Sequence, residues 1–93
     1  DRINFQNYGA YIMIRNAELV QIQGVEVTRM GQSGTLGRYP IHFHMINPYD
    51  KTGMNWFVKG CSIHHNNQRC LVIHHTNGIV AQDNVAYRTN GHC

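Results

Sequence analysis

The 93 residues of this chain suffice for one small domain, and 42% hydrophobic with 14% charged residues indicate a packed core rather than a disordered segment. Eight lysines and arginines against five carboxylates give a net charge of +3, which protonation of the seven histidines would raise. The chain has no basic run, no RNA-binding signature and no stretch near the roughly 20 apolar residues that cross a bilayer, which argues against nucleic-acid binding and membrane insertion by this segment.

Short apolar stretches alternate with corners rich in glycine and asparagine. The first stretch, AYIMI at 10–14, alternates as a strand does. Three later segments share one pattern, in which Gly or Asn precedes two apolar residues separated by a small or polar one: IQGVEV at 22–27, VKGCSI at 58–63 and QDNVAY at 82–87. Gly24, Gly60 and Asn84 tolerate a positive φ, so we expect each to form a sharp corner that leads into a strand.

A second series of strands interleaves with the first, at 40–44 (PIHFH) and 70–74 (CLVIH). The period is about 24 residues, and clusters of turn-forming residues at 31–37 and 47–53 lengthen the first turn as two loop insertions. Such a period, with short strands and almost no helix, predicts an all-β solenoid of about three turns, a parallel β-helix. The alternative is an antiparallel sandwich, in which the NG dipeptides serve as hairpin turns.

The second series carries histidines on one face. Alternate side chains of a strand point to opposite faces, so His42 and His44 share one face while Ile41 and Phe43 share the other. Equivalent strands of a β-helix stack about 4.8 Å apart. Aligning the apolar faces of the two strands then places His44 over His74. We therefore expect His42, His44 and His74 to lie together on one solvent-facing patch.

Three neighbouring imidazoles are compatible with several kinds of chemistry. They form a workable ligand set for zinc or another divalent metal. They can also act as general acid and base, or bind an acidic ligand when protonated. A column of outward histidines without a chemical role is the remaining alternative. His64, His65 and His75 fall where strands run into corners, and at least one of each neighbouring pair is expected to cap backbone groups.

The three cysteines do not match a closed disulfide set or a zinc knuckle. Cys70 and Cys93 lie nearly one period apart, so a disulfide between them and a pair of buried thiols both remain open. Cys61 is expected to be a small core residue. The five carboxylates are sparse, and the sequence does not pair them as a standard glycosidase requires.

Two stretches carry a family resemblance, GRYPIHFH at 37–44 and VKGCSIHHNNQRCLVIHHTNGIVAQDNVAYRTNGHC at 58–93. From about Val25 to Cys93, the chain resembles the β-helix region of the family of the cell-migration-inducing hyaluronan-binding protein, the transmembrane cell-surface hyaluronidase and the fibrocystin-like proteins. The resemblance implies a right-handed parallel β-helix. Residues 1–93 would then be a single segment of that domain in a larger secreted or membrane-anchored protein.

The resemblance also implies an activity. Some family members bind and depolymerise hyaluronan, with calcium dependence attributed to that activity. We therefore expect an extracellular or cell-surface protein that binds, and as an enzyme depolymerises, an acidic polysaccharide such as hyaluronan. The alternative is a non-catalytic structural or adhesive module of a large ectodomain.

The candidate site residues fall into two groups. His42, His44 and His74 are the expected catalytic residues and metal ligands, with calcium implied by the resemblance and zinc favoured by the ligand type. Five further residues match the family motifs and are expected to bind substrate: Arg38, His64, Arg69, Asp83 and His92. A planar guanidinium pairs well with a carboxylate, so the two arginines are expected to bind the acidic groups of the glycan.

Overall fold

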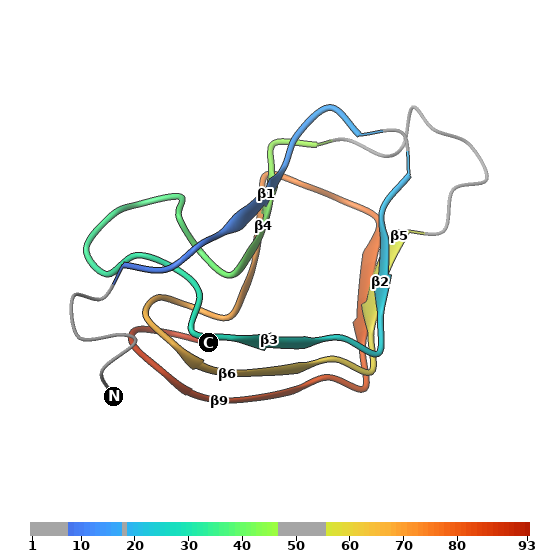
Figure 1. Ribbon diagram of the computed structural model, residues 1–93. Helices are drawn as coiled ribbons and strands as arrows, with labels where there is room; N and C mark the ends of the chain where they lie inside the picture. The colour runs from blue at the N-terminus through green and yellow to red at the C-terminus, as the bar shows by residue number, and fades with distance from the viewer. Residues whose placement is uncertain (1–7, 18, 47–55) are drawn as a thin grey trace.

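The computed structural model describes residues 8–17, 19–46 and 56–93, which contain nine short strands and no helix (Figure 1). In chain order the strands are β1 Ile12–Ile14, β2 Gln21–Gln23, β3 Glu26–Thr28, β4 Ile41–His44, β5 Trp56–Lys59, β6 Ser62–Asn66, β7 Leu71–His74, β8 Ile79–Gln82 and β9 Val85–Thr89. The described residues are therefore all-β, as the sequence predicted. None of them belongs to a helix long and apolar enough to span a membrane.

The strands form three parallel sheets of three strands each, in the orders β1-β4-β7, β2-β5-β8 and β3-β6-β9. The chain thus visits the sheets in the same order three times. We call β1 to β3 the first pass, β4 to β6 the second and β7 to β9 the third. Figure 1 shows the strands of each sheet lying over one another around a common interior. Parallel pairing between passes excludes the antiparallel sandwich, whose neighbouring strands would be joined by hairpins.

The prediction of a right-handed parallel β-helix is wrong as a description of this architecture. The described residues form three separate short sheets and not a closed or curled solenoid. The reason is physical: residue spacing and side-chain alternation indicate which strands pair. They do not determine how far the sheets curl toward one another, nor the hand of any coil.

The register between β4 and β7 is the predicted one. Ile41 pairs with Leu71, and His44 pairs with His74. The apolar face of β4 is fully buried, because Ile41 and Phe43 both have 0% of their surface exposed. Alternation of side chains along β4 therefore leaves His42 and His44 on the opposite face, as expected.

The core lies between the three sheets and draws side chains from all of them. Its buried members are Ile14, Val27, Ile41, Phe43, Ile46, Trp56, Val58, Cys61, Ile63 and Cys70. Cys61 is a buried free thiol, which confirms its predicted place in the core. Burial of these apolar groups is the main favourable term in folding.

Residues with positive φ recur at equivalent positions of all three passes. They follow the strands of the first sheet at Asn16, Met45 and His75 and those of the second at Gly24, Gly60 and Asp83. In the third sheet they are Arg29, which follows β3, and His65 and Arg88, which lie near the ends of β6 and β9. Gly24 and Gly60 confirm the predicted corners. The prediction for Asn84 is wrong, since the third residue of that column is Asp83. Aligning the segments by residue type placed this corner one position too late.

Asn84 instead uses its side chain to join two passes. Its Nδ2 donates to the carbonyl of Val58 at 3.0 Å, and its Oδ1 accepts from the backbone N–H of Cys61 at 2.9 Å. Val58 lies near the end of β5 and Cys61 directly precedes β6, so the two backbone groups flank the corner at Gly60. The asparagine therefore satisfies polar groups that a bend in the chain would otherwise leave unpaired.

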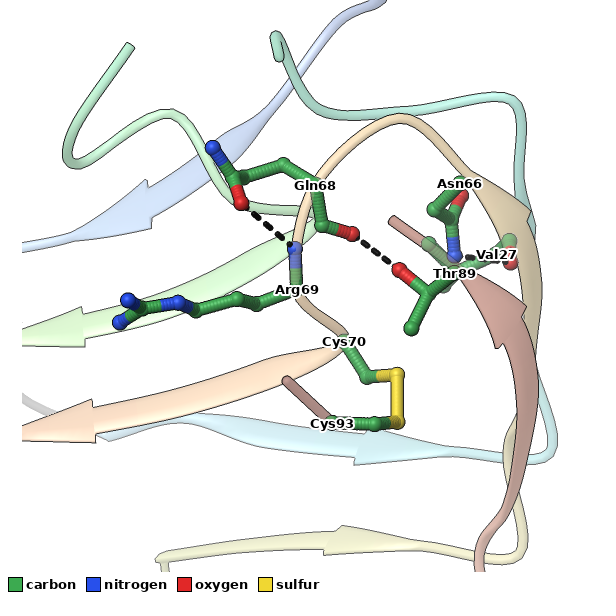
Figure 2. Close-up of a disulfide and its surroundings, with 7 residues drawn as sticks. All are labelled: Val27, Asn66, Gln68, Arg69, Cys70, Thr89 and Cys93. Carbon is green, nitrogen blue, oxygen red and sulfur yellow. Dashed lines mark hydrogen bonds between the residues drawn. A yellow bond between two sulfur atoms is a disulfide. The ribbon is translucent and has the colours of Figure 1, made fainter. Parts of the chain in front are cut away.

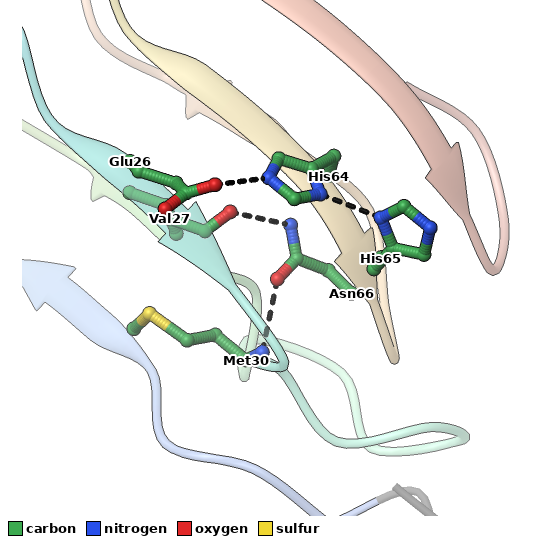
Figure 3. A network of polar contacts seen from close by, with 6 residues as sticks. All are labelled: Glu26, Val27, Met30, His64, His65 and Asn66. Carbon is green, nitrogen blue, oxygen red and sulfur yellow. Dashed lines mark hydrogen bonds and ion pairs between the residues drawn. The ribbon is translucent and has the colours of Figure 1, made fainter. Parts of the chain in front are cut away.

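Asn66 makes the equivalent link between the first and second passes and is buried, with 4% of its surface exposed. Figure 3 shows its Nδ2 donating to the carbonyl of Val27, at 3.4 Å, and its Oδ1 accepting from the N–H of Met30, at 2.9 Å. The amide replaces backbone partners where β3 ends.

Replacing Asn66 by alanine is expected to lower the free energy of unfolding by about 2 kcal/mol, because Met30 N–H and the Val27 carbonyl lose their partner inside the protein. Chemical denaturation of the purified protein measures this change. Asn77→Ala, at an exposed position, is the matched control and is expected to change stability by less than about 0.5 kcal/mol. Equal losses in the two variants would contradict the role given to Asn66.

Cys70 and Cys93 form a disulfide, with Cα atoms 4.9 Å apart, which settles the alternative of two buried thiols (Figure 2). The bond joins the start of β7 to the segment that follows β9. The Thr89 hydroxyl, also shown in Figure 2, donates to the carbonyl of Gln68. Both contacts tie the third pass to the corner that precedes β7.

The first predicted insertion is a loop between β3 and β4. The backbone N–H of Gln32 donates to the carbonyl of Arg38 at 3.0 Å and closes this loop. The second predicted insertion, 47–53, lies outside the described residues. The loop that follows β3 matters for the site, because it passes over the outer face of β4.

Candidate functional site

The structure brings His42, His44 and His74 together on the outer face of the sheet β1-β4-β7. One ring nitrogen from each lies within 4.8 Å of the others. The rings of His44 and His74 are stacked, with centroids 5.4 Å apart, and the ring of His42 meets that of His44 edge-on at 5.0 Å. The predicted cluster is therefore present. We call these three residues the trihistidine cluster.

The expectation that all three histidines face solvent is wrong for His42. Only 3% of its surface is exposed, whereas His44 is half-buried and His74 is exposed. The loop between β3 and β4 covers the His42 ring: Gly37 accepts a hydrogen bond from it, and the Tyr39 ring lies 4.9 Å away. Strand alternation predicted the face but not the loop that covers part of it.

The hydrogen bond to Gly37 fixes the tautomer of the neutral His42 ring. Its Nδ1–H donates to the Gly37 carbonyl at 2.9 Å, since a carbonyl oxygen can only accept. In the neutral ring the lone pair is therefore on Nε2. That atom is buried and has no hydrogen-bond partner, and the same is true of Nδ1 of His44.

The electrostatic surroundings favour neutral imidazole at His44. Burial lowers its pKa below the usual value of 6.5, and the positive charges of His42, Arg15 and His75 lower it further. Arg15 follows β1, where it continues the column of His44 and His74. A neutral imidazole offers a lone pair to a metal ion or accepts a proton.

The trihistidine cluster forms one wall of a pocket of about 460 Å³. Its lining residues come from β1, β4, β7 and the loops before β4 and β7: Met13, Leu36, Gly37, Tyr39, His42, His44, Arg69, Val72 and His74. None of these lining residues carries a carboxylate. The pocket thus combines one permanent positive charge, three imidazoles and apolar walls.

Of the two predicted arginines, only Arg69 lines the pocket. Its guanidinium lies over the Tyr39 ring, 5.3 Å from the centroid, and Figure 2 shows the side chain extending away from the disulfide. Arg38 does not line the pocket. It donates to Oε1 of Gln32 at 2.6 Å and lies over the ring of Tyr11, so it holds the loop that covers His42.

His64 lies on a different sheet, β3-β6-β9, and takes part in a second polar cluster shown in Figure 3. Its Nε2–H donates to the carboxylate of Glu26 at 2.6 Å, and its Nδ1 lies 2.5 Å from Nδ1 of His65. The Tyr87 ring stacks on His64 at 4.9 Å. These contacts join all three strands of that sheet.

The last two predicted residues also lie away from the pocket lining. Asp83 occupies the positive-φ corner between β8 and β9, and its φ of 58° explains why a residue type tolerant of that conformation stands there. His92 is exposed and directly precedes Cys93 of the disulfide. The eight candidate residues therefore do not form one site; four of them, the trihistidine cluster and Arg69, line the pocket.

Sequence reasoning missed Tyr39 and Gly37 as site residues. Tyr39 packs against His42 and supports Arg69, and Gly37 supplies the carbonyl that orients His42. Both belong to the motif GRYP, and that motif could have indicated them. Their roles depend on the loop folding back over β4, which no local pattern predicts.

The described residues suit some metals better than others. Calcium takes oxygen ligands, six to eight of them. Around the trihistidine cluster the described residues group three nitrogen donors and no carboxylate. Imidazole is a ligand for zinc, copper, nickel and iron. The cluster therefore fits a transition metal and does not fit the calcium ion that the resemblance implied.

Comparison with known proteins places the chain in a family. Residues 7–93 match the family model described as the CEMIP beta-helix. The chain is similar to human cell surface hyaluronidase CEMIP2, with 40% identity over 97% of the chain, and to zebrafish (Danio rerio) cell surface hyaluronidase, with 37% identity over 97%. It is also 35% identical, over its whole length, to the mouse (Mus musculus) cell migration-inducing and hyaluronan-binding protein.

The chain spans only 7% of the length of each of these three relatives. No solved structure matches it. The match with the family model nevertheless runs through all nine strands and the trihistidine cluster, and the identities hold over nearly the entire chain. The chain therefore belongs to the CEMIP beta-helix family.

Proposed function

We propose that this chain supplies a hyaluronan-binding surface and that the pocket beside the trihistidine cluster is the place where the glycan is bound and depolymerised. The observation that carries the proposal is the pocket itself, which joins Arg69 to three histidines and has no carboxylate among its lining residues. Relatives over nearly the whole chain are named hyaluronidase or hyaluronan-binding protein, which supports the choice of glycan.

The chemistry of the pocket suits an acidic polysaccharide. Hyaluronan carries a carboxylate on each uronic acid, and a guanidinium binds a carboxylate through two parallel hydrogen bonds. Arg69 lies over the Tyr39 ring and is thereby held toward the pocket. The apolar walls, Met13, Leu36 and Val72, offer surface to the sugar rings. Absence of a carboxylate from the lining avoids repulsion with the polymer.

Depolymerisation at this pocket would not use the usual pair of carboxylates. Glu26 and Asp83 are the described carboxylates, and neither lines the pocket; Asp1, Glu18 and Asp50 lie outside the described residues. The groups of the described pocket lining that can move a proton are the three imidazoles and the Tyr39 phenol. His44, half-buried and favoured in its neutral form, is the best placed to accept one.

An extracellular or cell-surface location fits the same proposal. A disulfide such as Cys70–Cys93 persists in oxidising compartments. Two of the relatives are named cell surface hyaluronidase. The competing function is that of a non-catalytic adhesive module, which would bind the glycan at this surface without shortening it.

Replacing Arg69 by alanine is expected to weaken hyaluronan binding by about tenfold, because a hydrogen-bonded charge pair contributes about 1.5 kcal/mol or more. Binding of the purified protein to immobilised hyaluronan measures this change. Arg88→Ala removes an exposed arginine from β9 and is the matched control, with affinity expected to stay within about twofold. Equal affinity of the Arg69 variant and the wild type would contradict the proposed binding mode.

The same preparations decide between enzyme and adhesive module. Size-labelled hyaluronan is incubated with the wild-type protein and its chain length is followed. Progressive shortening, slowed in His44→Ala, supports depolymerisation at the pocket. Binding with unchanged chain length would select the adhesive module.

A further inference from the structure

We propose that His42, His44 and His74 bind a transition-metal ion, with zinc as the reference metal, at the wall of the pocket. This inference deepens the proposed function and rests on it only where the role of the ion in glycan turnover is concerned. The binding itself is argued from the geometry of the three side chains.

The first argument is an imbalance in hydrogen bonding. Nε2 of His42 and Nδ1 of His44 are both buried and have no partner within the described protein. Leaving a buried polar atom unsatisfied costs about 1–3 kcal/mol, and native proteins rarely tolerate it without an ordered water or an ion. Two such nitrogens in one cluster are compatible with a bound ligand that satisfies both.

The second argument is the orientation of His42. Its Nδ1–H is held by the Gly37 carbonyl at 2.9 Å, which leaves Nε2 as the nitrogen with the lone pair. Metal-binding histidines almost always donate their other ring N–H to a carbonyl or carboxylate in this way. The bond fixes the tautomer and restricts the ring, so His42 is prepared for coordination.

The third argument is distance. Zinc binds imidazole nitrogens at about 2.0–2.1 Å, so two ligands of a tetrahedral site lie about 3.4 Å apart. The ligand atoms of the cluster already lie within 4.8 Å of one another. Side-chain rotations that move the ring nitrogens by about 1 Å would therefore complete the site. His74 is exposed and His44 half-buried, so both can move while the buried His42 stays in place.

The fourth argument is the space beside the cluster. Catalytic zinc sites have three protein ligands and keep a fourth position for water or substrate. Here the three histidines line an open pocket that Arg69 also lines, so a fourth ligand would be a water or an oxygen atom of the glycan. Such an ion would supply an acidified water or a polarised oxygen.

The test measures metal in the protein directly. The purified protein is treated with a chelator, loaded with zinc and freed of excess, and its zinc content is determined. We expect about one zinc ion per chain in the wild-type protein. His44→Ala and His74→Ala are expected to retain little zinc, because the affinity for the ion falls by at least about 100-fold in each. Because His74 is exposed, replacing it is not expected to unfold the protein, so a loss of zinc in His74→Ala reports on the site itself. Cobalt loading adds an absorption spectrum that reports tetrahedral coordination.

His92→Ala is the matched control, since it removes an exposed histidine outside the cluster and is expected to keep its zinc. Absence of bound zinc in the wild type, or full zinc content in His74→Ala, would overturn the site. Zinc binding without any shortening of hyaluronan would support the metal site and reject depolymerisation. Unchanged hyaluronan turnover by the metal-free protein would overturn the role of the ion in that reaction.

Discussion

Replacing Phe43 by alanine is expected to lower the free energy of unfolding by about 4 kcal/mol. The ring is fully buried in the core between the three sheets, with 0% of its surface exposed. Removing it takes away both the transfer free energy of the ring and the contacts of the atoms that surround it. Chemical denaturation of the purified protein, compared with the wild type, measures the change.

Phe57→Ala provides the matched control, because it makes the same chemical change at a side chain that lies on the face of β5 opposite the core. Phe57 is half-buried on β5, and the Lys59 ammonium group lies over its ring at 4.4 Å. We expect it to cost about 1 kcal/mol. A similar loss for both phenylalanines would show that burial between the sheets does not dominate stability.

Opening the disulfide is the second large effect. Cys93→Ser is expected to lower the free energy of unfolding by about 3 kcal/mol, because the bond closes a loop of 23 residues and so restricts the unfolded chain. The effect is measured by denaturation without reductant. Arg69 directly precedes Cys70 and lines the pocket, so we expect its position to be less well fixed when the bond is absent.

Cys61→Ala tests whether loss of a buried sulfur alone explains such an effect. Cys61 is a buried free thiol in the core that also contains Cys70, so its replacement removes a core sulfur without opening a covalent loop. It is expected to cost about 1 kcal/mol. Destabilisation of Cys93→Ser no larger than that of Cys61→Ala would refute the contribution of loop closure.

The proposals on glycan and metal concern the same pocket but depend on different groups. Arg69 carries the proposed contact with the carboxylate, while the trihistidine cluster carries the proposed metal site. Variants of Arg69 therefore test glycan binding, and variants of the trihistidine cluster test metal binding. Arg69→Ala is expected to weaken glycan binding while keeping its zinc, and His74→Ala is expected to lose zinc.

Much of the candidate site followed from local rules. Alternation along a strand put His42 and His44 on one face, and alignment of the apolar faces paired His44 with His74. The assignment of Arg38, His64, Asp83 and His92 to substrate binding remains a prediction, and the structure shows them away from the pocket lining. Motif similarity marks residues that a family shares, and these include corner, loop and sheet contacts as well as site residues.

The corner at Asp83 shows a limit of pattern matching. Asn84 resembles Gly24 and Gly60 in its tolerance of positive φ, yet the hydrogen-bond register places Asp83 in their column. Register is a property of the paired backbones, and a one-residue error in alignment by residue type is enough to miss it.

The sequence by itself determined that the chain is all-β, which faces of its strands are apolar, and that three histidines share an outer face, because side-chain alternation and corner chemistry are local. The tertiary structure decided that the strands form three separate parallel sheets and that the loop after β3 buries His42. It also decided that Arg69 lines the histidine pocket while Arg38 supports the loop. These features depend on contacts between segments distant along the chain, whose geometry no local pattern contains.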